Sequence, residues 1–153
     1  MNNITISYKI AEICDISIII KLMREYYAFE TIKLNEQNTK ERLEEFIKKC
    51  ELGKLWLIEI NNNAEGYIVV TNGFGLEHGR NVMIDEFYIR EKYRGQGIGL
   101  RTMQFIEKEL LSIGISSIHT EVDRKNHKAR EFWEKIGFQK YDRFPMTKMI
   151  INT

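Results

Sequence analysis

Apolar and polar positions follow two different periods along this chain, which predicts a domain that mixes strands with helices. Short stretches rich in aromatic and β-branched residues are typical of strands and occur at 5–10, 55–60, 66–71, 83–89 and 117–122. Apolar positions at helical spacing predict helices at 15–30, 38–50, 99–112 and 126–136. Two further strands are predicted on either side of Pro145, the single proline of the chain.

Local signals mark several of the predicted boundaries. Asp15 is placed to cap the first helix. Asn38, with Glu41 three residues later, forms a capping-box pattern at the start of the second helix. The asparagine run 61–63 separates the second and third strands, which predicts a hairpin.

The order of the predicted elements indicates a mixed sheet with helices on both faces. One strand and two helices come first, three strands follow, and the chain then continues helix, strand, helix, strand, strand. We expect an α/β (α+β) fold in which about seven strands are flanked by about four helices. With 153 residues, no internal repeat and no linker, the chain is expected to form one domain, 1–153.

Composition argues against several classes of partner and site. Lys and Arg number 23 against 22 Asp and Glu, and this near-neutral balance argues against nucleic acid as a partner. The aliphatic run 18–20 is too short to span a membrane, and the first residues lack the apolar segment of a secretory signal, so we expect a cytoplasmic protein. Cys14 and Cys50 are isolated, and the histidines have no ligand-like spacing, so we expect no metal site.

A glycine-rich loop, Arg94-Gly95-Gln96-Gly97-Ile98-Gly99, is the most informative segment and lies between the strand 83–89 and the helix 99–112. Because glycine has no Cβ atom, the backbone can turn tightly there and approach a ligand closely. The free amides and the positive dipole end of the helix that follows favour an anion. We therefore expect the loop to bind the pyrophosphate of a cofactor.

Two other phosphate-binding motifs do not fit this loop. A P-loop ends in Gly-Lys-Ser or Gly-Lys-Thr, whereas Gly99 is followed by Leu100 and Arg101. A dinucleotide-binding fold carries its glycines at the first strand–helix turn, with an acidic residue about 20 residues later. The glycines of this chain come well past its middle. A turn without a ligand is the remaining alternative, and Arg94 beside three glycines is more than such a turn requires.

Two segments together resemble a known family. Tyr93-Arg94-Gly95-Gln96-Gly97-Ile98-Gly99 is similar to motif A of the GNAT N-acetyltransferases, Arg/Gln-x-x-Gly-x-Gly/Ala. Further along, the segment 126–138 resembles motif B of that family, with Asn126, Ala129 and Gly137 at matching positions. The two motifs occur in the family's order, and the resemblance extends over nearly the whole chain. It implies a mixed, mostly antiparallel and twisted sheet.

The resemblance implies transfer of an acetyl group from acetyl-CoA to a primary amine by direct attack on the thioester. In the family, the pyrophosphate lies on the loop amides, and the pantetheine pairs with the backbone of the strand before the loop. Carried over residue by residue, the implied cofactor-binding positions are Phe87, Tyr88, Ile89, Arg94, Gly95, Gln96, Gly97, Ile98, Gly99, Asn126, Ala129 and Trp133.

Such a reaction needs a base, because an aliphatic amine with a pKa of ~10.4 is mostly protonated at neutral pH. Glu86 lies in the strand before the loop, where the resemblance implies a catalytic glutamate, so Glu86 is the expected base. Strand alternation sends the side chain of the adjacent Asp85 to the opposite face. Only one of the two carboxylates then faces the substrate, and the pattern leaves open which one does. A salt bridge at the sheet edge is the alternative role for either residue.

The chain departs from the family at the position of the general acid. Many members carry a tyrosine, proposed to protonate the thiolate, where this chain has Trp133. An indole N–H donates a hydrogen bond but does not titrate, so we expect Trp133 to pack against the cofactor. Tyr26, Tyr27, Tyr88 and Tyr141 remain candidates for the acid, and departure of the unaided thiolate is the other alternative.

Tyr26, Tyr27 and Glu30 precede the region that shapes the acceptor site in the family. Aromatic rings and carboxylates suit a cationic amine, so we expect a small amine acceptor. The alternative is a helix with one face in the core and its charges in solvent. Two other functions stay open, namely acetylation of a protein or peptide amine and a non-catalytic acyl-CoA-binding sensor. The sequence also permits a homodimer through the terminal strands or an exposed sheet edge.

Overall fold

The computed structural model of the chain describes residues 3–151. The first two and last two residues of the predicted domain 1–153 lie outside the described residues. The chain divides into two compact units, residues 1–121 and residues 122–153. The first unit holds the sheet and three of the helices, and the second holds the last helix.

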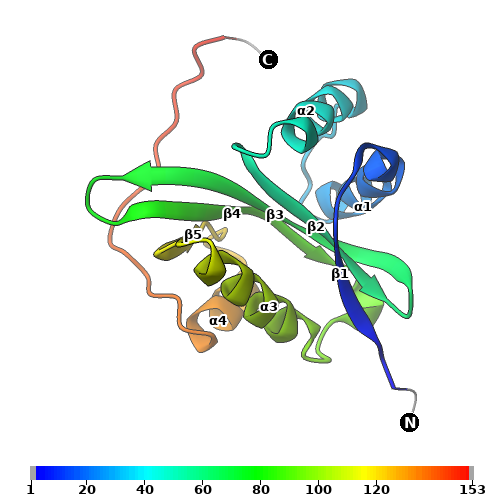
Figure 1. The fold of residues 1–153 in the computed structure, drawn as a ribbon. Coiled ribbons are helices and arrows are strands. Elements are labelled where there is room, and N and C mark those ends of the chain that lie inside the picture. Colours follow the sequence, from blue (N-terminus) through cyan, green and yellow to red (C-terminus); the bar gives the residue numbers. More distant parts are fainter. Residues whose placement is uncertain (1–2, 152–153) are drawn as a thin grey trace. The chain divides into compact units, whose positions relative to one another are not determined.

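The first unit is built on a five-stranded sheet whose strands follow one another in chain order (Figure 1). These strands are β1 (Ile6–Ile10), β2 (Gly53–Ile60), β3 (Asn63–Gly75), β4 (Gly79–Ile89) and β5 (Ser117–Thr120). Each of the first three neighbouring pairs is antiparallel, and β4 pairs with β5 in parallel. The expected mixed, mostly antiparallel sheet is therefore confirmed.

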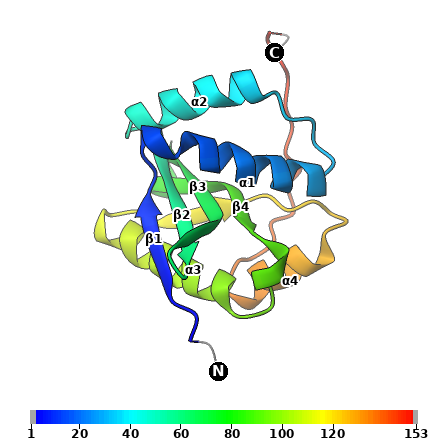
Figure 2. The same cartoon turned by 90° about the vertical axis from the view of Figure 1, so that its right-hand side faces the viewer.

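Helices cover both faces of this sheet, as the sequence predicts (Figures 1 and 2). The two helices α1 (Ile16–Phe29) and α2 (Glu36–Lys48) lie over one face, and α3 (Ile98–Ser112) lies over the other. Two short 3₁₀ turns, η1 (Ile13–Asp15) and η2 (Glu91–Tyr93), precede α1 and the glycine loop.

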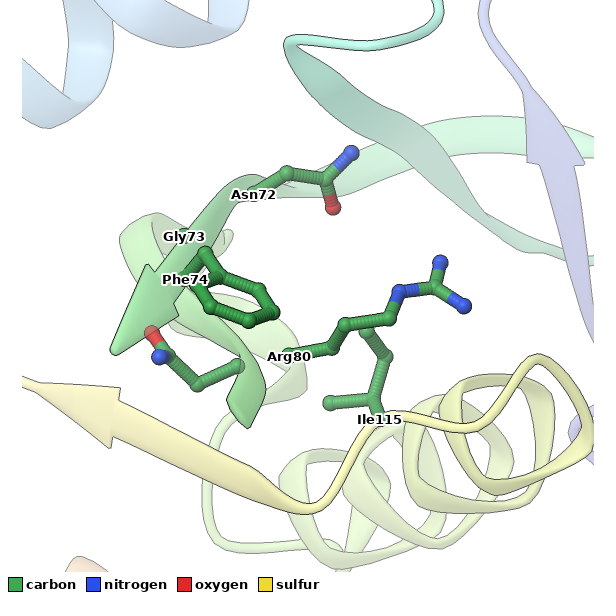
Figure 3. A pocket seen from close by; sticks show the side chains of 6 residues that line it. Asn72, Gly73, Phe74, Arg80 and Ile115 are labelled. Atoms are coloured by element: carbon green, nitrogen blue, oxygen red, sulfur yellow. The ribbon is translucent and has the colours of Figure 1, made fainter. Parts of the chain in front are cut away.

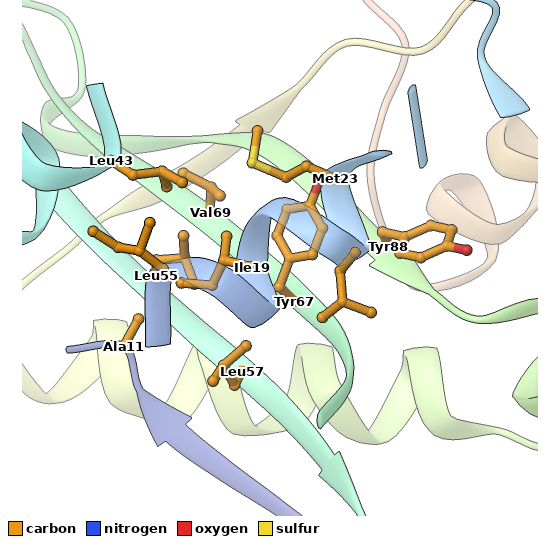
Figure 4. Packing of buried hydrophobic residues seen from close by; sticks show 11 residues of the cluster. Ala11, Ile19, Met23, Leu43, Leu55, Leu57, Tyr67, Val69 and Tyr88 are labelled. Atoms are coloured by element: carbon orange, nitrogen blue, oxygen red, sulfur yellow. The ribbon is translucent and has the colours of Figure 1, made fainter. Parts of the chain in front are cut away.

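Alternate residues of β2 and β3 build the core on the two faces. On the side of α1 and α2, the buried residues Ile19 and Leu43 belong to one cluster with Leu57 and Tyr67 of the sheet (Figure 4). On the side of α3, Ile58 belongs to a second apolar cluster, whose members include Ile60, Ile98, Phe87 and Ile89. Strands buried on both faces explain the almost continuous apolar runs in the sequence.

A bulge in β4 changes which face its side chains occupy. Val70 of β3 pairs with Ile84, but the next pair is Val69 with Glu86, so Asp85 is an extra residue in β4. Ile84 therefore lies on the α3 side, whereas Glu86 shares the α1 and α2 side with Val69. Without the bulge, Ile84 and Glu86 would lie on the same face.

Strand β4 extends well beyond the end of its pairing with β5. The parallel pairs run from Asn81 with Ser117 to Ile84 with Thr120, and none follows. Strand β4 continues to Ile89 in register with β3. The second half of β4 is therefore paired to a strand on the β3 side alone, within the described residues.

The second unit contains α4 (His127–Lys135) and the chain that follows it. The rings of Phe132 and Phe138 lie edge-on to Trp133, with centroids 5.0 and 4.9 Å away. The two strands predicted around Pro145 are wrong, because residues 136–151 contain no strand. The sheet thus has five strands within residues 3–151 rather than about seven. A strand is stable only when it pairs with another strand. The β-forming residues of this segment favour an extended backbone, but they do not by themselves provide a partner.

Two helix starts also differ from the predicted caps. Helix α2 begins before the expected start, because the side chain of Asn35 accepts the amide of Asn38 at 3.1 Å. Asp15 precedes α1 as predicted, but its carboxylate does not cap that helix. It accepts hydrogen bonds from the Lys9 ammonium and the Glu12 amide, both at 2.9 Å.

The contact of β3 with β4 at Gly66 generates a stability prediction. A Cβ atom at Gly66 would lie 2.4 Å from the carbonyl oxygen of Tyr88, and backbone cannot move aside easily. We expect Gly66→Ala to lower the free energy of unfolding by about 2 kcal/mol, measured by urea denaturation. Gly75→Ala is the matched control in the same strand, because its new Cβ would meet only the Asn81 side chain at 3.7 Å. Equal stability of the two variants would contradict the prediction.

Candidate active site

Glu86 is a half-buried carboxylate that accepts hydrogen bonds from two tyrosine hydroxyls. Tyr67 of β3 donates to its Oε1 at 2.6 Å, and Tyr27 of α1 donates to its Oε2 at 2.8 Å. Burial is the strongest influence and raises the pKa of Glu86, and the negative charge of Asp85 raises it further. The two hydroxyl donors act in the opposite direction, and the pKa stays above the ordinary glutamate value.

The two donors belong to a cluster of four tyrosines on the same side of the sheet. The ring of Tyr26 lies 5.7 Å from that of Tyr27, 6.5 Å from Tyr67 and 5.6 Å from Tyr88, measured between centroids. Burial raises the pKa of Tyr26 to about 12 and raises those of Tyr27 and Tyr67 as well. These hydroxyls therefore stay protonated at neutral pH and act as donors to the carboxylate.

Asp85 lies outside this cluster. It is the extra residue of the bulge and is exposed, whereas Glu86 is directed toward the tyrosines. The two neighbouring carboxylates therefore differ in exposure, and the charge of Asp85 still acts on Tyr26, Tyr27 and Glu86. Tyr27 donates to Glu86, and the ring of Tyr26 packs edge-on to that of Tyr27. Three residues predicted from the sequence therefore lie together. Glu30, the C-cap residue of α1, acts on Tyr26 through its charge.

An ion network beside the cluster was not predicted. Arg90, at the end of β4, donates to both carboxylate oxygens of Glu25 in α1, at 2.9 and 2.7 Å, and to Glu65 at 2.8 Å. Lys92 also lies 3.1 Å from Glu65. Arg90 lowers the pKa of Glu25, and the pKa of the buried Glu65 is also lowered because its cationic partners outweigh its burial. The network joins α1, β3 and β4 immediately before the glycine loop.

The glycine loop connects η2 to α3 through two left-handed residues. Gly95 has φ +72° and Gly97, the residue that caps α3, has φ +77°. A Cβ atom added at either position would meet no protein atom within 4 Å, so backbone conformation rather than packing requires glycine. The backbone amide of Arg101 donates to the Gly97 carbonyl at 3.1 Å, so the amides of the three residues before Arg101 lie in the unpaired first turn of α3. The loop therefore leads directly into a helix start whose first amides have no partner within the helix.

Arg94 connects this loop to both β4 and α1. Its Nε donates to the carbonyl of Ile89 at 2.8 Å. Its guanidinium lies 4.9 Å from the ring centroid of Phe29 and 5.4 Å from that of Tyr88. The side chain expected at the loop entrance is therefore also packed against the last residue of α1.

The remaining predicted positions fall into two groups. Phe87, Tyr88 and Ile89 occupy the part of β4 that follows the last pair with β5. Asn126 and Ala129 belong to the second unit, where the Asn126 side chain accepts the Ala129 amide at 3.1 Å and so caps α4. The paired asparagine and alanine of the second motif are thus explained by the start of that helix, and Trp133 lies among phenylalanines of the same unit.

Two features were missed because sequence alone does not reveal which distant residues meet. Tyr67 stands in an apolar strand, and a buried tyrosine normally finds a hydrogen-bond partner, but nothing local identifies Glu86 as that partner. The network of Arg90 joins residues of three elements that are far apart in the chain.

A separate cavity of about 440 Å³ lies at the turn between β3 and β4 (Figure 3). Its lining residues are Asn72, Gly73, Phe74, Arg80, Asn81 and Ile115. The Arg80 guanidinium donates to the Ile113 carbonyl at 2.7 Å. Asn81 stands five residues before Glu86 along β4, a separation of roughly 17 Å in an extended strand. This cavity is therefore distinct from the tyrosine cluster.

Residues 3–151 offer neither a metal site nor a membrane span. No group of three or more His, Cys, Asp and Glu side chains in this range is arranged to hold a metal ion. No helix of this part of the chain is long and apolar enough to cross a membrane.

Comparison with known proteins identifies related sequences and folds. The thialysine N-epsilon-acetyltransferase of Mus musculus is 28% identical over 134 aligned residues, which cover 79% of this chain and 76% of that protein. An integron cassette protein from the mobile metagenome of Cole Harbour Salt Marsh has a TM-score of 0.84 at 24% identity, over 95% of this chain and 91% of that one. A predicted acetyltransferase of Clostridium acetobutylicum, solved with acetyl-CoA, has a TM-score of 0.79 at 20% identity, over 94% and 96% of the two chains.

The family assignment rests on most of the chain rather than on a short motif. The profile of the Acetyltransferase (GNAT) family matches residues 19–138, which include most of α1, the bulged β4, the glycine loop and α4. The fold agrees with that of the solved structures. The chain therefore belongs to the GNAT family and is an acetyltransferase.

Proposed function

We propose that the chain transfers an acetyl group from acetyl-CoA to the primary amine of a small cationic acceptor, with Glu86 as the base. The observation that carries this proposal is the half-buried Glu86 carboxylate, which lies on the strand that leads into the glycine loop and accepts hydrogen bonds from Tyr27 and Tyr67. One relative is a thialysine N-epsilon-acetyltransferase, and a structure of the same fold contains acetyl-CoA. Both facts support the proposal.

The residues present fit a pyrophosphate-bearing coenzyme. The loop is exposed, its glycines leave open space beside the backbone, and the amides of Ile98 and Gly99 lie in the unpaired first turn of α3. We assign the pyrophosphate to the amides of 96–99 and to Arg94. The pantetheine is assigned to the backbone of 87–89, where β4 has no pair with β5. Acetyl-CoA supplies the activated acetyl group as a thioester.

The tyrosine cluster and its carboxylates give the acceptor side its chemistry. Rings of Tyr26 and Tyr27 can contact a cationic amine, and the charges of Glu30 and Asp85 favour it. Glu86 removes one proton from the ammonium, so that the free amine attacks the thioester. The C–N bond forms as the C–S bond breaks, and the second proton of the nitrogen passes to solvent. A raised pKa brings a carboxylate closer to the working pH, which makes Glu86 a better base than an exposed glutamate. Because the indole of Trp133 does not titrate, it cannot protonate the leaving group, and we expect coenzyme A to leave as a thiolate.

A panel of acceptors tests this function directly. We would measure CoA release from acetyl-CoA with polyamines, thialysine, lysine, aminoglycosides and lysine peptides, and record product masses. The proposal expects turnover with small cationic amines and a product heavier by one acetyl group. Turnover with peptides alone would show that the acceptor is a peptide amine rather than a small cationic amine. If no acceptor in the panel gives turnover but acetyl-CoA still raises the melting temperature, the small-amine acceptor would be excluded, whereas binding of acetyl-CoA would be supported.

Substitution of Gly97 tests the loop as the pyrophosphate site. Gly97→Ala places a Cβ atom on a left-handed residue beside the loop amides, so we expect acetyl-CoA affinity to fall more than tenfold by calorimetry. Gly114→Ala is the matched control, because Gly114 has φ +79° at the other end of α3. Both variants carry backbone strain of about 1 kcal/mol, but only the first is expected to lose affinity. Equal acetyl-CoA affinities of the two variants would exclude the loop as the pyrophosphate site.

Substitution of the two neighbouring carboxylates tests the base. We expect Glu86→Gln to lower kcat by about 10²–10³-fold and to leave acetyl-CoA affinity unchanged, because it removes the base alone. Asp85→Asn is expected to change kcat much less, because Asp85 is exposed, whereas the Glu86 carboxylate accepts hydrogen bonds from Tyr27 and Tyr67. A larger loss from Asp85→Asn would transfer the role of base to Asp85.

A further inference from the structure

We propose that Tyr67 is a positioning residue that keeps Glu86 in its carboxylate form and in one orientation, through its buried hydroxyl on Oε1. The inference rests on the proposed function, in which Glu86 is the base. Tyr67 was not among the residues that the sequence pointed to, and it acts through Glu86 rather than on the substrate.

Geometry separates the roles of the two tyrosines. Tyr67 is fully buried, with 0% of its surface exposed, so an acceptor in solution cannot contact it. Its ring is held by Tyr26 at 6.5 Å and by Tyr88 at 6.2 Å, which fixes the direction of the hydroxyl. Tyr27 is only half-buried and donates to the other carboxylate oxygen, so it remains accessible to an acceptor.

The charges around Glu86 explain why this hydroxyl matters. Among the described residues, the groups that influence Glu86 are Tyr67 from β3, Tyr27 from α1 and Asp85 from β4 itself. Tyr26, also from α1, interacts with it through charge. None of these groups is a cation. The two hydroxyls therefore provide the stabilisation that a lysine or arginine would give to a buried carboxylate elsewhere.

Loss of one hydroxyl must then favour protonation of Glu86. Burial and the Asp85 charge already raise the pKa of Glu86, and the Tyr67 hydrogen bond lowers it. Tyr67→Phe removes that bond without changing the size of the ring, so the pKa of Glu86 rises further. Below the raised pKa the base is protonated and inactive, and above it the carboxylate is restored.

The test is the ratio of kcat/KM between Tyr67→Phe and the unsubstituted enzyme across pH 5.5–9.5, with one amine acceptor from the panel. The pKa of the amine cancels in this ratio. In each enzyme kcat/KM falls at low pH as Glu86 is protonated, and we expect the midpoint of this acidic limb to lie about one pH unit higher in the variant. The ratio of kcat/KM should therefore drop by up to about tenfold at low pH and recover at high pH. A ratio that does not depend on pH would overturn the inference.

Tyr8→Phe is the matched control. Its hydroxyl also donates to another side chain, Thr102 at 3.3 Å, but Tyr8 lies in the cluster on the α3 side and does not contact Glu86. This variant should show a flat ratio of kcat/KM over the same pH range. A shift as large as that of Tyr67→Phe would attribute the effect to general loss of a hydroxyl and overturn the inference.

A double-variant cycle distinguishes failure of the inference from failure of the proposed function. If Tyr67 acts through Glu86, adding Tyr67→Phe to Glu86→Gln causes no further loss. A full additional loss would overturn the role of Tyr67, whereas unchanged activity of Glu86→Gln alone would remove Glu86 as the base. If Tyr67→Phe does not fold, 3-fluorotyrosine at position 67 keeps the hydroxyl and strengthens it as a donor. The acidic limb should then move down, and an unchanged limb would count against the proposal.

Discussion

The bulge at Asp85 is the constraint on which the arrangement of the candidate site depends. The first half of β4 supplies Val82 and Ile84 to the core on the α3 side, and regular alternation would send Glu86 the same way. One extra residue reverses the alternation, so that Glu86 and Tyr88 join Tyr67 on the side of α1. The length of the strand, more than its composition, therefore determines where its carboxylate lies.

The site also shows how a half-buried carboxylate is stabilised by hydroxyl donors rather than by a cation. Arginine is available nearby, but Arg90 is occupied by Glu25 and Glu65, and Arg94 lies over Phe29 and Tyr88. The hydroxyls of Tyr27 and Tyr67 stabilise the carboxylate through hydrogen bonds, but because they are neutral they do not cancel its negative charge. Such a charge remains able to attract a proton from an ammonium group, which a carboxylate in a tight ion pair does less readily.

Features encoded over a few adjacent residues were predictable, and those that depend on distant pairing were not. The glycine loop, the strand before it and the helix after it were located from the sequence, because turn glycines and helical periodicity are local signals. The sequence left open whether Asp85 or Glu86 faces the substrate, and the face that Glu86 occupies follows from its pairing with Val69 of β3. Asn35 and Asn38 both suit a helix cap, and only the folded helix selects Asn35. The strands around Pro145 were wrong because no partner strand pairs with that segment in the described chain.

The position of Arg94 has a consequence for how this enzyme can diverge. One guanidinium contacts the end of α1 at Phe29, the ring of Tyr88 and the carbonyl that ends β4, and it belongs to the glycine loop. A substitution at Phe29 therefore alters the packing of Arg94, the residue that opens the loop. Under the proposed function, in which the loop holds the coenzyme and Tyr26 and Tyr27 of the same helix contact the acceptor, acceptor preference and coenzyme affinity would therefore be inherited together rather than evolve independently.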